Sequence, residues 1–386
     1  MSYGTLALVV AIGLLGPLLA LLPSRIAPPV VIGEIVAGVI FGRTGTRTIV
    51  AIQPTLAFLA DIGFALLMFI VATNLPLRDT RLRGAAGRGA LVAGITVVLA
   101  IAVSPFLAAA TGLHRPAILA VLVASSSAAI VLPVIGSQRR DEALLVTIAW
   151  VSIADVATVL AVPFVLSTGG FGRALAGVVL VIAGAIACGL VIRWLVGLQP
   201  VEELRDASHH LAWALDLRFS LLVLFGLAWI AERFDTSALL AGFAAGIVVS
   251  LLGEPSRVAD QLIGLGQGFF VPLFFVVLGA RIDLRALVHS RDDLVLFALL
   301  AISTTLVPVV AAAIVRLPLT SGLLAAAEMG VPSAVASLGL ATNVLQPGQA
   351  AAIVGAAALS LVATSIGAIR LGANPRLNPG APPAGA

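Results

Sequence analysis

The 386-residue chain has no lysine, one cysteine and few charged residues of any kind. All 22 basic residues are arginine, and charged residues make up 10% of the chain, whereas a soluble domain carries roughly 25%. Because a soluble fold must cover its surface with polar groups, this composition excludes an ordinary globular domain. Cys188 stands alone in an apolar run, which excludes an intrachain disulfide and argues against a metal cluster. The arginines are scattered over short loops, so membrane topology explains them better than nucleic-acid binding.

Apolar residues make up 60% of the chain, and the mean hydropathy is +1.16. Apolar runs of about 20 residues, the length that spans a hydrocarbon core, recur from end to end. The two-residue alternation of a transmembrane β-barrel is absent from the sequence, so the backbone must be satisfied within helices. We predict an all-α polytopic membrane protein with about 13 transmembrane helices, at residues 3–22, 29–42, 53–74, 89–111, 115–137, 142–168, 172–196, 210–231, 236–252, 260–280, 293–315, 319–343 and 348–371.

Arginine counting predicts the orientation. The loops on the side of the C-terminus carry 13 arginines and those on the opposite side carry eight. Cytoplasmic loops are enriched in basic residues, so we expect the N-terminus outside and the C-terminus in the cytoplasm of a cell membrane. Residues 1–371 are expected to form a single transmembrane domain, and residues 372–386, rich in Pro, Gly and Ala, a disordered tail.

The chain also shows a weak internal repeat. "GEIVAGVIFG" resembles "AGFAAGIVVS", "LADIGFALLMFIVATNLPL" resembles "LGQGFFVPLFFVVLGARIDL", and "SSSAAIVLPVIG" resembles "VPSAVASLGLAT". Pairing Asn74 with Arg281 gives an offset of 207, and pairing Ser127 with Ser333 gives 206. This offset crosses seven predicted spans, an odd number, so the copies would be inverted, as in secondary transporters. We expect repeats at about 29–168 and 236–371, joined by linker helices at 172–231.

Asp155 is the clearest functional candidate, because an ionisable residue inside a span is costly. It lies mid-span in "TIAWVSIADVATVLAVPFV", with no arginine at helical spacing. Removal from water favours a neutral carboxyl, whereas a bound cation favours the charged form. One Asp can therefore hold either a proton or a metal cation. The alternative is a protonated Asp that is hydrogen-bonded between helices.

Two further spans contain small, hydroxyl and proline residues at matching places, in "ASSSAAIVLP" and "EMGVPSAVAS". This pattern points to interrupted helices, whose free carbonyls and half-helix dipoles can coordinate a cation. Simple packing by small residues is the alternative. Asp61 could line a water-filled path or form a structural pair. We predict Asp155 as the metal-cation ligand with Ser125, Ser126, Ser127 and Ser152 as ion-binding residues, supported by Glu328, Ser333, Asp61, Thr304 and Thr305.

These stretches resemble the monovalent cation/proton antiporter superfamily, in particular bacterial NapA-type sodium/proton antiporters and KefC-type potassium efflux systems. The resemblance covers about residues 5–370. The stretches on which the resemblance rests are "PPVVIGEIVAGVIFG", "LADIGFALLMFIVATNLPL", "SSSAAIVLPVIG", "IADVATVLAVPFV", "FFVPLFFVVLGARIDL" and "EMGVPSAVASLGLAT". It implies inverted repeats, two crossing interrupted helices, a homodimer in the lipid bilayer and elevator-like alternating access. It also implies exchange of Na+ or K+ for H+ by a transporter, not an enzyme, with no cofactor, and its ion-binding Asp matches Asp155.

The chain departs from the family pattern at four places. Ala154 stands where electrogenic members have a second Asp, and the helix at 293–315 lacks the Lys of those members. Asn74 stands where a Glu is common, and Ala326 where an Arg often precedes the Glu that matches Glu328. The first two departures favour single-Asp members, in which one carboxylate trading one proton for one cation would be electroneutral.

Three other functions stay open. A channel or gated potassium efflux system would favour a repeated filter sequence or a ring of charges, and the sequence shows neither. An organic-anion symporter of related fold would prefer an Arg-lined pocket, for which Arg218 and Arg281 are candidates. An intramembrane aspartyl protease needs two facing Asp residues, one normally within Gly-x-Gly-Asp, a motif that the chain lacks.

Overall fold

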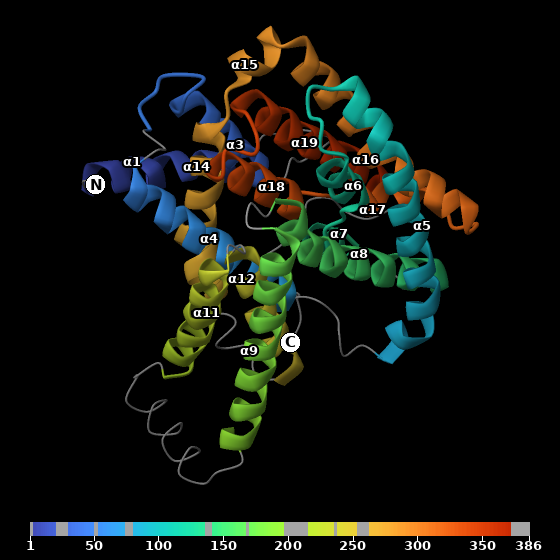
Figure 1. Ribbon diagram of the computed structural model, residues 1–386, viewed down its shortest axis with the longest axis horizontal. Coiled ribbons are helices and arrows are strands. Elements are labelled where there is room, and N and C mark those ends of the chain that lie inside the picture. Colours follow the sequence, from blue (N-terminus) through green and yellow to red (C-terminus); the bar gives the residue numbers. More distant parts are fainter. Residues whose placement is uncertain are drawn as a thin grey trace. The chain divides into compact units, whose positions relative to one another are not determined.

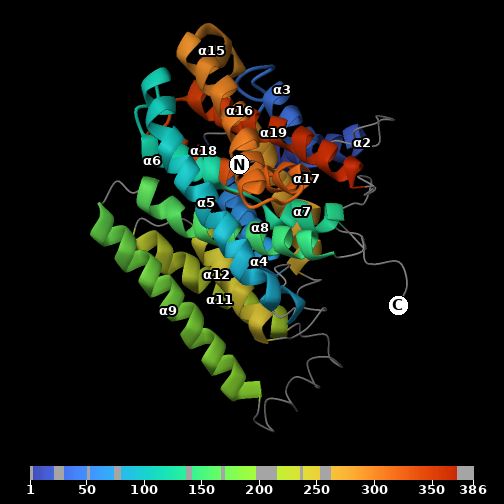
Figure 2. The same cartoon turned by 90° about the vertical axis from the view of Figure 1, so that its right-hand side faces the viewer.

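The computed structural model describes residues 3–20, 30–49, 53–73, 80–135, 141–166, 170–196, 215–234, 238–252 and 262–371. Within these residues the chain is helical and contains no strand (Figures 1 and 2). Each of the 13 predicted apolar segments contains a helix. The segments at 115–137 and 319–343 are interrupted by several non-helical residues, and the segment at 3–22 is divided by a turn at Leu14 alone. The predicted fold class, an all-α membrane protein with two interrupted helices, is therefore confirmed.

The described residues fall into two compact units. One unit is drawn from Met1–Ile52, Asp79–Leu166 and Phe275–Ala386, and the other from Gln53–Arg78 and Ser167–Phe274. The first unit contains α1 (Tyr3–Gly13), α2 (Leu15–Ala20), α3 (Val30–Phe41), α5 (Thr80–Ala110), α6 (Pro116–Ala124), α7 (Ala128–Ile135), α8 (Glu142–Leu166), α15 (Leu284–His289), α16 (Arg291–Ile314), α17 (Leu319–Ala325), α18 (Gly330–Ala341) and α19 (Pro347–Arg370). The second contains α4 (Pro54–Thr73), α9 (Phe171–Val196), α11 (Leu215–Arg233), α12 (Ala238–Leu252) and the π-helix η1 (Gly266–Phe270). The boundary between the units falls within α14 (Val271–Arg281), whose residues from Phe275 onward belong to the first unit.

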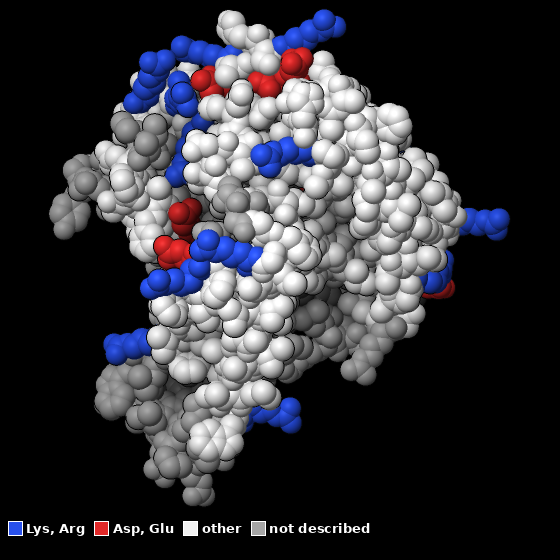
Figure 3. All heavy atoms as spheres, viewed as in Figure 1, with Lys and Arg blue, Asp and Glu red and all other residues white. Residues whose placement is uncertain are grey.

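Hydropathy and charge agree with a membrane setting. Eight helical stretches in the described part of the chain are long and apolar enough to cross a bilayer. Large apolar side chains such as Phe106, Trp194 and Trp229 are exposed, which in water would be unfavourable but in lipid is the expected state. Charged side chains are sparse on the face seen in Figure 3, most of whose described surface is uncharged.

The second unit is built on a close contact between α4 and α12. Gly242 and Gly246, four residues apart on α12, bring its backbone against the carbonyl groups of Ala65 and Phe69 on α4. A Cβ atom at either glycine would collide with these carbonyl oxygens. Small residues at a four-residue spacing permit this approach, as is common between helices in membranes. Helices α9 and α11 pack against α12 and against each other.

In the first unit, α8 packs against both interrupted helices. Helix α8 packs against α5, against α6 and α7 from the first interrupted segment, and against α17 and α18 from the second. In both ribbon views these segments lie side by side although about 200 residues separate them in sequence (Figures 1 and 2). Helix α16 covers α5, α6, α17 and α19. The packing therefore brings the predicted broken spans to the helix that carries Asp155.

Some boundaries differ from those predicted. Helix α5 begins at Thr80 rather than at residue 89, because hydropathy marks the apolar part of a helix and its first turns carry Arg81, Arg83 and Arg88. The short helix α15 lies outside the predicted segments, since six residues are too few for an apolar period. The predicted tail at 372–386 lies outside the described residues, as does part of the predicted linker at 172–231. The extents of the repeats remain predictions.

Candidate functional site

The first interruption lies at three consecutive serines. Helix α6 ends at Ala124 because Ser125 has an extended backbone, with φ −71° and ψ 152°. Helix α7 begins at Ala128. Serine side chains compete with the backbone for hydrogen bonds and favour helix ends over helix interiors, so a Ser-Ser-Ser run is a natural place for a break. All three serines are buried.

The second interruption lies at residues 326–329, between α17 and α18. Met329 has non-helical angles, φ −154° and ψ −36°, and Gly330 begins the next helix. Pro332 falls in the first turn of α18, where its missing N–H is not needed by the helix. The sequence thus locates this break to within a few residues. Pro332 does not lie in the break itself but in the first turn of the helix that follows it.

The two interruptions meet. The backbone N–H of Ser127 donates a hydrogen bond of 2.7 Å to the carbonyl oxygen of Ala327. The side chains of Ser125 and Glu328, 203 positions apart in sequence, are also hydrogen-bonded. Each break leaves backbone groups without helical partners. Here a hydrogen bond between the two breaks gives a partner to one backbone group of each.

Asp155 lies on α8 beside this junction. It is 5% exposed, and its Oδ2 accepts a hydrogen bond of 3.0 Å from the backbone N–H of Ala128, the first residue of α7. The free N–H groups and positive dipole end of a helix favour a negative charge in this position. The carboxyl group therefore sits where a break supplies polar contacts inside an apolar unit.

Hydroxyl groups without hydrogen-bond partners accompany the two interruptions. The buried oxygens of Ser126, Ser152, Ser333 and Thr304 have no partner among the described residues. Buried polar atoms are rarely left unpaired, so such a set marks a place that would accept an ion or a water. Oxygen donors are the ligands that hard cations prefer. Thr304 also lies near the carboxyl of Glu328, without completing a hydrogen bond.

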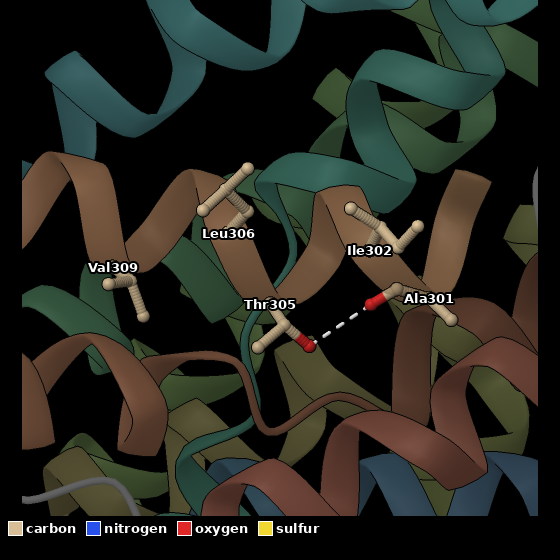
Figure 4. A pocket seen from close by; sticks show the side chains of 5 residues that line it. All are labelled: Ala301, Ile302, Thr305, Leu306 and Val309. Carbon is tan, nitrogen blue, oxygen red and sulfur yellow. Dashed lines mark hydrogen bonds between the residues drawn. The ribbon is translucent and has the colours of Figure 1, made fainter. Parts of the chain in front are cut away.

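Two predicted supporting residues lie elsewhere. Thr305 is half-buried on α16, and its hydroxyl donates 3.1 Å to the carbonyl of Ala301. Figure 4 shows it lining a hollow on α16 together with Ala301, Ile302, Leu306 and Val309. Asp61 is exposed on α4, which belongs to the second unit. The structure therefore groups Thr304, but not Thr305, with Glu328.

The charges around the junction are few. The described ion pairs are Arg88 with Glu142 and Arg43 with Asp283, all of them outside the mid-span part of these helices. Among the described residues, groups of three or more His, Cys, Asp or Glu side chains that could hold a metal are absent. The site is thus built from two carboxyls, hydroxyls and backbone groups. The amide of Ala128 and the carbonyl of Ala327 carry no signal in the sequence, because every residue except proline has both groups.

Comparison with known proteins agrees with this architecture. The family model described as "Sodium/hydrogen exchanger, transmembrane" matches residues 8–370. The YjbQ protein of Bacillus subtilis is 22% identical over 95% of this chain, and the Na(+)/H(+) antiporter NhaS5 of Synechocystis is 26% identical over 78%. The chain spans 62% of the length of YjbQ and 41% of NhaS5.

Two further matches cover more of the compared protein. The Na(+)/H(+)-K(+) antiporter GerN of Bacillus cereus is 22% identical over 74% of each chain. The solved structure of the sodium proton antiporter MjNhaP1 from Methanocaldococcus jannaschii has a TM-score of 0.62, covering 95% of this chain and 98% of that one at 15% identity. This last similarity shows a shared fold.

Proposed function

We propose that this chain, which belongs to the sodium/hydrogen exchanger transmembrane family, exchanges a monovalent cation for protons across a cell membrane, with Asp155 as the exchanging group. The observation that carries the proposal is the position of Asp155. It is a buried carboxyl on a membrane-spanning helix, hydrogen-bonded to the first amide of α7. A group of this kind holds either a proton or a cation, which is the competition that exchange requires.

The cation would be bound by oxygen atoms. Asp155 supplies the charge, and Ser125, Ser126, Ser127 and Ser152 supply hydroxyl or carbonyl oxygens at and near the first break. The unpartnered oxygens of Ser126 and Ser152 support this assignment, since a cation would give them the partner they lack. Na+ and K+ both fit such donors, and the named functions of the relatives include both ions. Glu328, Ser333 and Thr304 would support the site from the second break.

We propose one-for-one, electroneutral exchange by elevator-type alternating access in a homodimer. The lack of lysine supports the stoichiometry, because one carboxylate without a basic partner trades one proton for one monovalent cation. The N-terminus would lie outside and the C-terminus in the cytoplasm, as the arginine distribution favours. The proposed mechanism requires the lipid bilayer, monovalent cations and protons, and it uses no cofactor.

The test is proton movement in proteoliposomes. With a pH gradient imposed, addition of Na+, K+ or Li+ should dissipate the gradient in wild type, and Asp155→Asn should abolish the effect. Glu142→Gln is the matched control, because Glu142 is an exposed carboxyl on the same helix whose partner is Arg88. Full exchange in Asp155→Asn would refute the assignment of that residue. Cation flow in wild type that is not coupled to proton movement would instead favour a channel.

A further inference from the structure

The hydroxyl of Ser125 contacts two oxygen atoms at once. Its Oγ lies 2.8 Å from the carbonyl oxygen of Leu122, one turn earlier on α6, and is also hydrogen-bonded to Oε2 of Glu328. A serine hydroxyl carries a single hydrogen, and a carbonyl oxygen can only accept. One serine hydrogen cannot make two full hydrogen bonds, so we assign the second hydrogen to Glu328, as a carboxylic acid.

Among the described residues, the helices around Glu328 carry no positive charge outside their end turns that would favour a carboxylate. Glu328 is 2% exposed and lies between α17 and α18. The helices that pack against these two are α6, α8, α16 and α19. Outside their first and last turns, these helices contain one ionisable residue, Asp155. A second unpaired charge buried among these helices would be costly.

We propose that Glu328 keeps its proton throughout the transport cycle and acts as a neutral hydrogen-bond donor to Ser125, which in turn donates to the carbonyl of Leu122. Glu328 is in this sense a positioning residue. It fixes the end of α6 and joins the two breaks without adding charge. Asp155 alone then changes its protonation, so that one negative charge at the junction of the two breaks matches one monovalent cation. The inference rests on the proposed exchange function and specifies which of the two carboxyls at the junction, Asp155 or Glu328, carries the transported proton.

Substitutions separate a neutral donor from a proton carrier. Glu328→Gln retains an uncharged N–H donor and should keep exchange within about threefold of wild type, with the same pH profile and no charge movement. Glu328→Ala and Ser125→Ala each remove the bond and should lower the rate roughly tenfold. Because the two side chains act as a pair, the double Ala variant should be no slower than either single variant. Additive losses, or a pH profile altered by Glu328→Gln, would overturn the proposal.

Infrared spectroscopy tests the proton on Glu328 directly and independently of transport. A protonated carboxylic acid has a C=O stretching band that a carboxylate lacks. The difference between Asp155→Asn and Asp155→Asn/Glu328→Gln should contain this band at every pH at which the wild type exchanges ions. Loss of the band within that range would show that Glu328 releases its proton. If wild type showed no exchange at all, the proposed function would fail, and the band would still decide the state of Glu328.

Discussion

The backbone amide of Ser127 donates to the carbonyl of Ala327 across 2.7 Å, and this bond joins the two interrupted helices at their breaks. Within a bilayer each backbone polar group needs a partner from the protein, because lipid offers none. The two breaks provide partners for each other, and Asp155 provides one for the amide of Ala128. The irregular backbone at this depth therefore finds hydrogen-bond partners within the protein, one of which is the carboxyl group of Asp155.

Replacing Ala128 by proline should weaken cation binding. Proline removes the N–H that donates to Asp155, while the first position of a helix otherwise accepts proline well. A hydrogen bond to a charged group is worth about 1.5–3 kcal/mol, so the cation concentration for half-maximal exchange should rise roughly tenfold or more. Ala128→Gly keeps the amide and serves as the control. Equal behaviour of the two variants would show that this bond does not contribute to binding.

Replacing Ser126 by alanine should raise stability and lower cation affinity together. Its buried oxygen has no hydrogen-bond partner within the described part of the chain. Removing an unsatisfied polar group should stabilise the cation-free protein by up to about 1 kcal/mol. Thermal unfolding in detergent and a cation titration measure the two effects. The control is Ser360→Ala, since Ser360 is fully buried and bonded to the carbonyl of Ala357. That variant should lose stability with unchanged affinity, and the same pattern in Ser126→Ala would contradict an ion-binding role.

Cation and proton should compete. If both bind Asp155, the cation concentration for half-maximal exchange falls as the pH rises, by at most about tenfold per pH unit where the carboxyl is protonated. Initial rates over a matrix of pH and cation concentration measure this relation. A half-maximal concentration independent of pH would place the proton and the cation on different groups.

Exchange should be insensitive to membrane voltage. One cation exchanged for one proton moves no net charge, and the absence of lysine leaves no basic partner to carry an additional proton. Proteoliposomes clamped at different potassium diffusion potentials with valinomycin should show equal Na+-driven rates. A rate that changes with the imposed potential would indicate a second transported proton.

Gly246→Ala should destabilise the second unit. A Cβ at this position would collide with the carbonyl oxygen of Phe69, so α4 and α12 would have to separate, at a cost of about 1–3 kcal/mol. Gly226→Ala on α11 is the control, because its Cβ would meet open space. Alanine favours a helix over glycine by up to about 1 kcal/mol, so this variant should unfold at an equal or higher temperature. Similar melting temperatures for both variants would argue against the tight contact.

The sequence alone determined the helical membrane architecture and the location of the breaks, and it singled out Asp155 as a mid-span carboxyl. Long apolar runs, a Ser-Ser-Ser stretch and a mid-span carboxyl are local features, and their physical costs in lipid are known in advance. Only the tertiary structure decided which groups meet. Thr304 and Thr305 are neighbours in sequence, yet the first lies near Glu328 and the second lines a hollow with Leu306, because successive residues on a helix face different directions. The hydrogen bonds from Ser127 to Ala327 and from Ala128 to Asp155 are donated by backbone N–H groups, which every residue except proline has, so only the packing of distant helices could reveal them.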